Sequence, residues 1–387
     1  MISVTRLYCD RHTSGDALRY QREAASRKPI VVWNCTRTCN LRCVHCYSQS
    51  CGESYEGELS TAEAMDMIRD LAAFGAPVLL FSGGEPLLRD DLFELGAFAR
   101  ELGIRTVIST NGTLITRSVA EKIKQTGFSY VGISLDGVGE TNDTFRGVKG
   151  AFDAALRGFE NCISIGQKVG LRLTMTRRNV QGLPAIFDLI EDAGIPRACF
   201  YHLVYTGRGA EIVDEDVTRR QAREAVDLIF DRAADFHRRG LDRDILTVDN
   251  HCDGPYLYMR LLREDPAQAA EALRLLRANG GNASGIAIGC VDNLGSVHPD
   301  QFWQSHTLGN VRERPFSSIW TDTSDPIMAG LKDRKPLLKG RCAAENCRWI
   351  DECNGNFRAR AVAVYGDPWM QDPACYLTDE EIARHRG

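Results

Sequence analysis

The chain has 387 residues, of which 43% are hydrophobic and 26% are charged, an ordinary balance for a globular protein of two or three domains. Its formal net charge of −5 provides no basic field for nucleic acid or anionic lipid. The chain begins without an apolar core of signal-peptide length, and no apolar run reaches the ~18 residues of a membrane span. We therefore expect a cytoplasmic protein that binds neither nucleic acid nor membrane, and we expect it to be a monomer.

Short apolar runs alternate with amphipathic stretches over residues 30–205, which is typical of β/α units and a parallel sheet. Six strands are predicted, at Ile30–Cys35, Val78–Ser82, Ile104–Ser109, Tyr130–Leu135, Leu171–Thr176 and Ala198–Val204. Four of the predicted helices are Asp90–Leu102, Ser118–Gln125, Ala151–Ile165 and Leu183–Ala193. A further helix is predicted from Ser60, where Ser-Thr-Ala-Glu has the form of a capping box. Six units are too few to close an eight-stranded barrel.

Three cysteines, Cys39, Cys43 and Cys46, follow the first predicted strand at the spacing C-x3-C-x2-C. Iron–sulfur cubanes are ordinarily held by four cysteines. Three thiolates would leave one iron open, where a small chelating molecule can bind, so the pattern predicts a [4Fe-4S] cluster that takes part in chemistry. A structural zinc site would require four closed ligands. Zinc or a redox thiol pair remains the alternative.

Polar and glycine-rich motifs follow the next strands, at Gly83–Pro86, Thr110–Gly112 and Ser134–Gly137. The carboxyl ends of parallel strands meet at one end of a β/α barrel, and sites form there. Gly83 and Gly84 allow a ligand to approach the backbone closely, and Glu85 offers a carboxylate to an ammonium group. Gly83–Pro86 alone is also compatible with an ordinary turn. Thr174, on the fifth strand, is a weaker candidate because a β-branched residue often only packs.

The end of the sixth strand carries His202 and, a few residues on, Arg208. Arginine binds carboxylates through two parallel hydrogen bonds, and histidine can ligate haem iron. Both residues are therefore candidates for substrate contact and catalysis, although a strand histidine is more often a satisfied core group. Alternative iron ligands are His251, His298 and His306.

Residues 210–285 are charged and mostly helical in pattern, and we interpret them as a bridge between two domains. Residues 286–300 then predict a β-hairpin with Asn293–Gly295 near its tip. These divisions give an N-terminal segment over 1–29, a β/α domain over 30–209, the bridge over 210–285 and a C-terminal domain over 286–387.

The C-terminal domain contains a second cysteine set, C-x4-C-x5-C and a fourth cysteine after 21 residues, formed by Cys342, Cys347, Cys353 and Cys375. Four thiolates can fully ligate one cubane, and zinc is again the alternative. The other cysteines lack cluster spacing, and we expect buried, inert thiols at Cys9, Cys35, Cys51, Cys162, Cys199, Cys252 and Cys290.

With the aromatic Tyr47 directly after Cys46, the first cysteine set resembles the signature of the radical S-adenosylmethionine (SAM) superfamily. The resemblance implies an α/β fold with a partial (β/α)6 barrel. It also implies that SAM chelates the open iron and is cleaved to methionine and a 5'-deoxyadenosyl radical. The residues that it assigns to cofactor binding are Tyr47, Gly83, Gly84, Glu85, Thr110, Asn111, Ser134, Asp136 and Thr174.

The second cysteine set resembles the SPASM extension of that superfamily, whose seven-cysteine pattern holds two auxiliary clusters. This chain departs from the pattern in two places. Phe357 stands where the full motif has a cysteine, and Cys290 lacks its downstream mate. The resemblance therefore implies one auxiliary [4Fe-4S] cluster, held by the four cysteines of the second set.

Several segments, including residues 200–209 and 340–361, resemble the tetrapyrrole-modifying branch of these enzymes, and most of all those of haem d1 biosynthesis. That resemblance implies an iron tetrapyrrole substrate, 12,18-didecarboxysirohaem, whose two propionates are replaced by oxo groups. It also implies an electron donor such as flavodoxin or ferredoxin. Alternatives are a didecarboxysirohaem deacetylase, a coprohaem decarboxylase and a peptide-modifying enzyme. A non-enzymatic electron carrier would not need the motifs at the strand ends.

Overall fold

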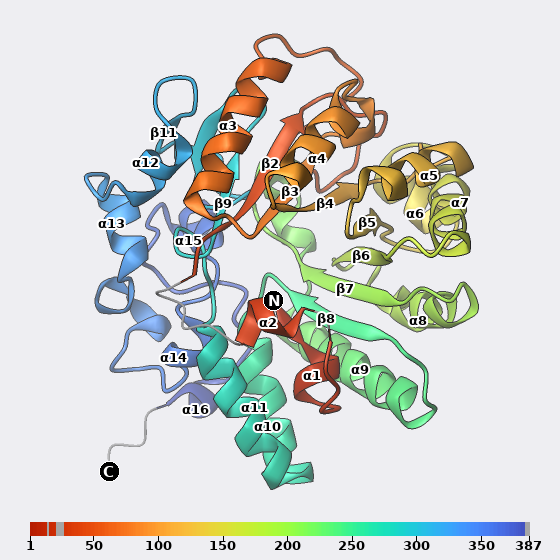
Figure 1. Ribbon diagram of the computed structural model, residues 1–387. Coiled ribbons are helices and arrows are strands. Elements are labelled where there is room, and N and C mark those ends of the chain that lie inside the picture. Colours follow the sequence, from red (N-terminus) through yellow and green to blue (C-terminus); the bar gives the residue numbers. More distant parts are fainter. Residues whose placement is uncertain (14, 21–26, 384–387) are drawn as a thin grey trace.

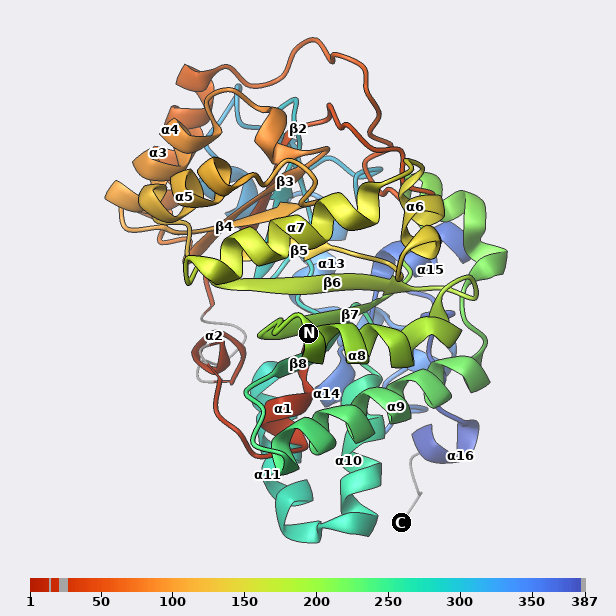
Figure 2. The ribbon, with the colours of Figure 1, turned by 90° about the vertical axis from the view of Figure 1, so that its right-hand side faces the viewer.

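The computed structural model describes residues 1–13, 15–20 and 27–383. One curved sheet of 11 strands, in the order β1-β8-β7-β6-β5-β4-β3-β2-β9-β10-β11, forms the wall of an open barrel. Helices cover the outer face of this wall, and the C-terminal segments lie beside the ends of the strands (Figures 1 and 2). None of the described helices is long and apolar enough to cross a membrane.

The six predicted strands are confirmed, each within a few residues of its expected bounds. They are β2 (Ile30–Thr36), β3 (Val78–Gly83), β4 (Arg105–Thr110), β5 (Val131–Ser134), β6 (Val169–Met175) and β7 (Arg197–His202). Every neighbouring pair is parallel. Their polar ends therefore meet at one end of the barrel, as a β/α fold requires.

The expected helices also form between these strands. They are α3 (Thr61–Phe74), α4 (Leu92–Glu101), α5 (Arg117–Thr126), α7 (Ala151–Ser164) and α8 (Leu183–Asp192), with the short α6 (Glu140–Arg146) in addition. The capping box at the start of α3 is present, since Ser60 and Glu63 each bind the backbone N–H of the other. These helices bury one apolar face each against the outer side of the sheet.

The bridge contains the expected helices, α9 (Arg219–Arg238), α10 (Asp253–Glu264) and α11 (Pro266–Asn279), but also one unexpected strand. This strand, β8 (Asp244–Val248), pairs in parallel with β7 and so adds a seventh parallel strand to the six that were expected. Its uncharged run, Ile245–Val248, has only four residues and is flanked by charged residues, so the sequence pattern did not indicate a strand. The N-terminal β1 (Ile2–Ser3) pairs antiparallel with β8, and the short α1 (Val4–Leu7) and α2 (Asp16–Tyr20) follow β1.

The predicted hairpin is confirmed as β9 (Ile288–Val291) and β10 (Ser296–His298), followed by β11 (Gly309–Asn310). Unexpectedly, β9 pairs in parallel with β2, so the hairpin continues the barrel sheet rather than starting a separate one. Short helices complete the chain: α12 (Phe316–Thr321), α13 (Pro326–Lys332), α14 (Ile350–Cys353), α15 (Arg358–Tyr365) and α16 (Asp379–Ile382).

Alternation along the strands separates the packed outer face of the sheet from the inner face. On β3, for example, Leu79 and Phe81 are buried in the main core, whereas Leu80 and Ser82 face cavities inside the barrel. The described residues line one such cavity at the carboxyl ends of the strands and another nearer their amino ends.

Candidate functional site

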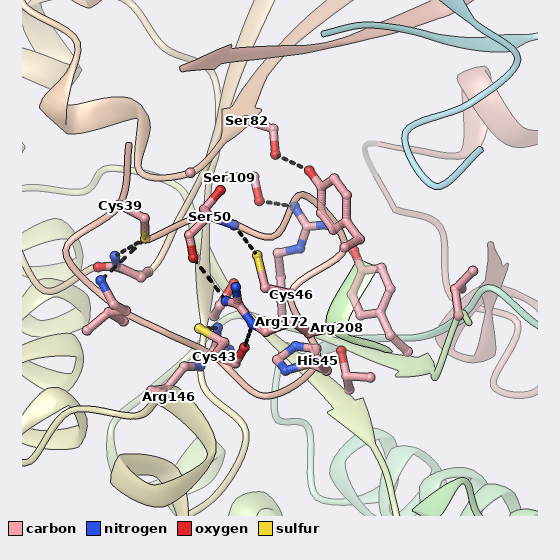
Figure 3. Close-up of a pocket in the computed structure, with 18 of the residues that line it drawn as sticks. Cys39, Cys43, His45, Cys46, Ser50, Ser82, Ser109, Arg146, Arg172 and Arg208 are labelled. Atoms are coloured by element: carbon pink, nitrogen blue, oxygen red, sulfur yellow. Dashed lines mark hydrogen bonds between the residues drawn. The ribbon is translucent and has the colours of Figure 1, made fainter. Parts of the chain in front are cut away.

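The first cysteine set lies on the loop after β2 and lines a cavity of about 140 Å³ at the carboxyl ends of the strands (Figure 3). Each sulfur accepts a hydrogen bond. Cys39 Sγ accepts from Leu41 N at 3.4 Å, Cys43 Sγ from Arg146 Nη1 at 3.6 Å and Cys46 Sγ from Ser50 N at 3.4 Å. Hydrogen bonds to thiolate sulfur stabilise and tune iron–sulfur clusters. Three thiols of this kind around one cavity fit a cubane with one open iron.

Burial disfavours the charged form of the Cys39 and Cys43 thiols when no metal is bound. It raises the pKa of Cys39 to about 12, and it raises the pKa of Cys43 although Arg146 opposes the shift. A metal that binds here must therefore displace protons, as is usual for thiolate sites.

Gly83 and Gly84 bring the end of β3 against the backbone that leads into the cysteine loop. A Cβ on Gly83 would lie 2.2 Å from Thr36 O, and one on Gly84 would lie 2.1 Å from Thr38 O. The close approach is held by Gly84 N, which donates to Thr36 O at 2.7 Å, and by Glu85 N, which donates to Thr38 O at 2.9 Å. The two glycines thus both line the cavity and fix where the cysteine loop begins.

The Glu85 carboxylate is fully buried behind the cavity wall and already has three protein donors. It accepts hydrogen bonds from Thr110 Oγ1 at 2.6 Å, Asn111 N at 2.8 Å and Leu87 N at 3.2 Å. Burial raises the pKa of Glu85. Thr110 and Asn111 themselves line the cavity, whereas Glu85 is not among its lining residues. Its expected contact with an ammonium group remains a prediction.

Ser134 and Thr174 also line the cavity, but Asp136 lies behind it and serves its neighbours. Asp136 Oδ1 accepts from Thr174 N at 2.7 Å, and Oδ2 forms an ion pair with Arg146, the donor to Cys43. His45 Nε2 is 3.7 Å from the same oxygen. Asp136 therefore orients the guanidinium that contacts a candidate cluster ligand.

Arg146 and His45 both line the cavity, and sequence reasoning missed both. Burial lowers the pKa of His45 to about 4, so its imidazole is neutral at neutral pH. The position of His45 between Cys43 and Cys46 was the available signal for this residue. Arg146 belongs to α6, which no sequence pattern predicted, so no signal marked it.

Tyr47 and Arg208 hold the cysteine loop against the barrel. The Tyr47 hydroxyl donates to Asn34 Oδ1 at 2.9 Å and lies 3.0 Å from Ser82 Oγ. Arg208 donates from Nε to Cys43 O at 2.7 Å and from Nη2 to Ser50 O at 3.0 Å. Both residues line the cavity, but the Arg208 guanidinium is largely engaged by loop carbonyls.

His202 ends β7 at the cavity wall, and its ring contacts α10. Its Nε2 lies 3.1 Å from Asp253 Oδ2 on α10, and Tyr376 donates to the other oxygen of Asp253 at 2.6 Å. Tyr376 and Asp253 directly follow Cys375 and Cys252 in the chain. His202 therefore connects the wall of the first cavity with the second cysteine set.

The second cysteine set encloses a small cavity of about 20 Å³. Cys342, Cys347, Cys353 and Cys375 line it, as a closed four-thiolate cubane site requires. A fifth thiol, that of Cys252 at the start of α10, lines the same cavity and lowers the pKa of Cys375 to about 7 by hydrogen bonding. Sequence spacing missed Cys252 because it lies about 90 residues before the set. In the described ranges, no three His, Cys, Asp or Glu side chains converge closely enough to hold a single metal ion.

The two residues at which the chain departs from the seven-cysteine pattern, Phe357 and Cys290, are both buried against other protein groups. Phe357 belongs to an apolar cluster with Val204 and Trp303, and its ring centroid lies 5.6 Å from that of Phe302. Cys290, on β9, is fully buried and accepts from Asn34 Nδ2 at 3.6 Å. Cys290 is not among the residues that line either cysteine cavity.

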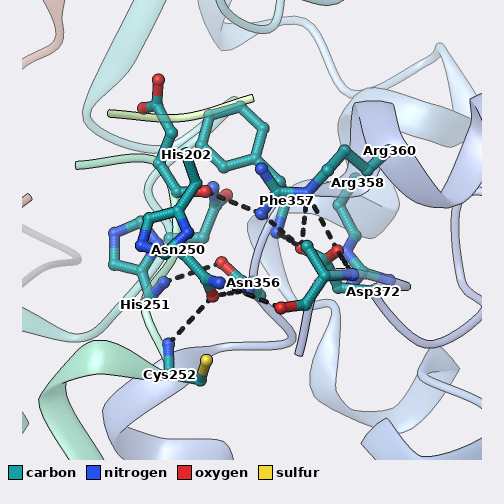
Figure 4. A network of polar contacts seen from close by, with 12 residues as sticks. His202, Asn250, His251, Cys252, Asn356, Phe357, Arg358, Arg360 and Asp372 are labelled. Atoms are coloured by element: carbon teal, nitrogen blue, oxygen red, sulfur yellow. Dashed lines mark hydrogen bonds and ion pairs between the residues drawn. The ribbon is translucent and has the colours of Figure 1, made fainter. Parts of the chain in front are cut away.

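A buried polar network joins the C-terminal segments to the barrel (Figure 4). Arg360 and Asp372 form an ion pair at 2.8 Å with both side chains fully buried. Arg360 also donates to Leu203 O at 3.1 Å and Asp249 O at 2.6 Å, at the ends of β7 and β8. The two cysteine cavities are therefore held in a fixed relation.

Comparison with known families identifies the barrel. A model described as the radical SAM superfamily matches residues 33–190. The chain is 60% identical to an Fe-coproporphyrin III synthase of Methanosarcina barkeri, over 99% of both chains. It is 46% identical to a pre-heme d1 synthase of Dinoroseobacter shibae, over 92% of this chain and 87% of that one. It is 31% identical to an AdoMet-dependent heme synthase of Methanosarcina barkeri, over 89% of this chain and 95% of that one.

Solved structures show the same fold at lower sequence identity. SuiB of Streptococcus suis, bound to its precursor peptide, matches with a TM-score of 0.71 and 18% identity, over 91% of this chain and 76% of that one. The protein anSMEcpe with bound AdoMet matches with a TM-score of 0.68 and 18% identity, over 90% of this chain and 93% of that one. The α/β partial barrel with a C-terminal SPASM domain, expected from the sequence, is thereby confirmed.

Proposed function

The chain belongs to the radical SAM superfamily, and from this premise we propose that it acts on 12,18-didecarboxysirohaem, removing acetate side chains to form Fe-coproporphyrin III. The observation that carries the proposal is the 60% identity, over 99% of both chains, to an Fe-coproporphyrin III synthase. The haem d1 reaction is the second candidate. It has weaker support, because the pre-heme d1 synthase is 46% identical.

A reduced [4Fe-4S] cluster with SAM would supply a 5'-deoxyadenosyl radical, chemistry that belongs to the cofactor. In this proposal Cys39, Cys43 and Cys46 hold the cluster. Gly83, Gly84, Thr110, Asn111, Ser134 and Thr174, which line the cavity, would hold SAM. Glu85 and Asp136 act from behind that wall, by fixing Asn111 and Arg146. Tyr47 and Arg208 keep the cysteine loop closed over the barrel.

The second cysteine set, Cys342, Cys347, Cys353 and Cys375, would hold one auxiliary [4Fe-4S] cluster. The contacts from Tyr376 to Asp253 and from Asp253 to His202 place a polar connection between that site and the cavity wall. We assign His202 to the substrate side of the cavity. An external electron donor such as flavodoxin or ferredoxin would reduce the protein.

The test is an anaerobic incubation of the reconstituted protein with 12,18-didecarboxysirohaem, SAM and a reductant, followed by mass spectrometry of the tetrapyrrole. We expect Fe-coproporphyrin III together with 5'-deoxyadenosine. A product in which oxo groups replace propionates would favour the haem d1 reaction instead.

Cys46→Ala is the matched control for this assay. It removes one ligand of the SAM-binding cluster and leaves the second cysteine set intact, so it should abolish both products. If the wild-type protein cleaves SAM but leaves 12,18-didecarboxysirohaem unchanged, the proposed substrate is wrong.

A further inference from the structure

A second cavity, of about 340 Å³, lies inside the barrel nearer the amino ends of the strands. Interiors of β/α barrels are normally filled by side chains, whereas this one leaves a space of the size that holds small-molecule ligands. Much of its wall is apolar and comes from alternate residues of neighbouring strands, Ile30, Val32, Val78, Leu80 and Val107. Such a wall suits a flat hydrophobic ring.

This second cavity, called the lower cavity below, adjoins the cavity at Cys39, Cys43 and Cys46, called the cysteine cavity. Arg172, Tyr201 and Asp249 line both. A ligand in the lower cavity can therefore extend a substituent past these residues toward the three cysteines.

Cations outnumber carboxylates around the lower cavity. Its lining includes the basic residues Arg19, Arg27, Lys28, Arg105, Arg172 and Arg197, against the acidic Asp249 and Asp300. Asp300 is already held by Ser284 and by the backbone N–H groups of Phe302 and Trp303. Arg197 is paired with Asp244 at 2.5 Å and Arg19 lies 3.7 Å from Asp16, both outside the lining, so the lining keeps a smaller excess of positive charge.

Two of these arginines have no carboxylate within ion-pair distance among the described residues. Arg105 donates to Ser129 Oγ at 2.9 Å, and Arg172 donates to Ser109 Oγ at 2.6 Å while its guanidinium stacks 4.9 Å above the Tyr201 ring. Both side chains are half-buried, and partial removal of a charged group from water without a charge partner is costly. A ligand that brings carboxylates would offset that cost through bidentate pairs.

Five buried polar atoms of residues that line this cavity have no hydrogen-bond partner among the described residues: the hydroxyl of Tyr130, Oδ2 of Asp249, Nδ1 of His251, Oδ1 of Asn279 and Oε1 of Gln301. Asp249 and His251 are both at least nine-tenths buried. Buried polar atoms are almost always paired. Their lack of partners is an independent sign that a ligand belongs in this space.

We propose that the lower cavity binds the ring of an iron tetrapyrrole and that Arg105 and Arg172 bind its carboxylate side chains. This inference rests on the proposed function, because it supplies the substrate site for that reaction. Arg172 then lies where a bound side chain would cross from the lower cavity to the cysteine cavity.

The test is a spectroscopic titration of the reconstituted protein with Fe-coproporphyrin III, in the wild type and in Arg105→Gln. Arg105 lines the lower cavity and a shallow surface pocket beside Ser129, and it is not among the residues that line the cysteine cavity. We expect binding to weaken by about tenfold or more, the effect of losing a hydrogen bond to a charged group. Arg105→Lys should retain much of the affinity. Arg117→Gln, on the exposed surface of α5, is the matched control and should bind like the wild type.

A second ligand tests the carboxylate contact. The methyl ester of Fe-coproporphyrin III carries no negative side chains, so Arg105→Gln should bind it as the wild type does. Equal binding of free Fe-coproporphyrin III by Arg105→Gln and the wild type would overturn the site and leave the proposed function standing. If the wild type binds Fe-coproporphyrin III with the expected loss in Arg105→Gln, but does not convert 12,18-didecarboxysirohaem, the site stands and the proposed reaction fails.

Discussion

Several charged side chains near the cysteine loop act on other protein groups rather than on the cavity itself. Asp136 orients Arg146, and Arg146 donates to Cys43 Sγ. Glu85 holds the backbone N–H of Asn111, and Asn111 Nδ2 lies 3.9 Å from Cys39 Sγ. Each carboxylate thus influences a candidate cluster ligand through one intermediate residue. Side chains of this kind fix the geometry and hydrogen bonding of metal ligands.

Cys252 likewise acts on a candidate cluster ligand, in this case Cys375 of the second cysteine set. Its thiol lines the cavity of that set and lowers the pKa of Cys375, yet four other thiols suffice for a closed cubane. We therefore expect Cys252 to donate a hydrogen bond to the Cys375 sulfur rather than to bind iron.

Replacing Cys252 by Ala should lower the reduction potential of the auxiliary cluster and leave its iron in place. The donated hydrogen bond stabilises the reduced, more negative cluster. Its loss should shift the potential by on the order of 20–60 mV, the equivalent of ~0.5–1.5 kcal/mol for a one-electron couple. The measurement is a redox titration followed by electron paramagnetic resonance.

Cys162→Ala, which removes a buried thiol of α7, is the control and should leave the potential unchanged. Loss of about four irons in Cys252→Ala would instead make Cys252 a cluster ligand.

The residues of the site were predicted where they form local patterns and missed where they do not. The three cysteines, Gly83 and Gly84 are close in sequence or directly follow a strand, so spacing and strand ends located them. Arg146 and Cys252 reach their cavities only through the tertiary fold, from α6 and α10. No local pattern in a single sequence encodes such contacts.

At the scale of elements, the turn after β3 and the loop after β2 form one unit. The N–H groups of Gly84 and Glu85 donate hydrogen bonds to the carbonyl oxygens of Thr36 and Thr38. The backbone around Gly83 and Gly84 leaves no room for a Cβ at either position. Gly207 makes a similar approach from the other side, since its Cβ would lie 2.5 Å from Cys46 O. The cysteine loop is thus held between two glycine turns.

Gly84→Ala should therefore displace the cysteine loop and selectively lose the SAM-binding cluster. The added Cβ would meet backbone oxygen atoms at 2.1 and 2.6 Å, which cannot move independently of the loop. We expect iron content to fall from about eight to about four per chain, because only the second cubane remains.

Gly182→Ala is the control for this variant, since a Cβ there has no neighbour within 4 Å. It should keep about eight irons. Retention of about eight irons by Gly84→Ala would show that the loop tolerates the displacement.

Elements with strong periodicity were predicted well, whereas β8 was not. Its run Ile245–Val248 is shorter than a typical strand and lies within a charged, helix-rich stretch. Its place next to β7 depends on the barrel already being present. The pairing of β9 with β2 was unpredictable for the same reason, because it joins residues about 258 positions apart.

At the scale of the whole molecule, Arg360 and Asp372 connect the two cysteine cavities. Asp372 accepts from Arg360 Nε at 2.9 Å, from Phe357 N at 2.9 Å and from Ala374 N at 2.9 Å. Ala374 directly precedes the candidate ligand Cys375. Arg360 meanwhile binds the carbonyls that end β7 and β8. One buried ion pair thus fixes both the second cysteine set and its distance from the barrel.

Asp372→Ala should destabilise the protein much more than loss of a surface ion pair. It leaves Arg360 buried without a counter-charge, which costs about 3–5 kcal/mol. The measurement is the free energy of unfolding in urea. Asp66→Ala, which breaks the exposed pair with Arg69, is the control and should cost no more than ~1 kcal/mol. Equal effects of the two substitutions would mean that the C-terminal domain does not depend on this ion pair for its attachment to the barrel.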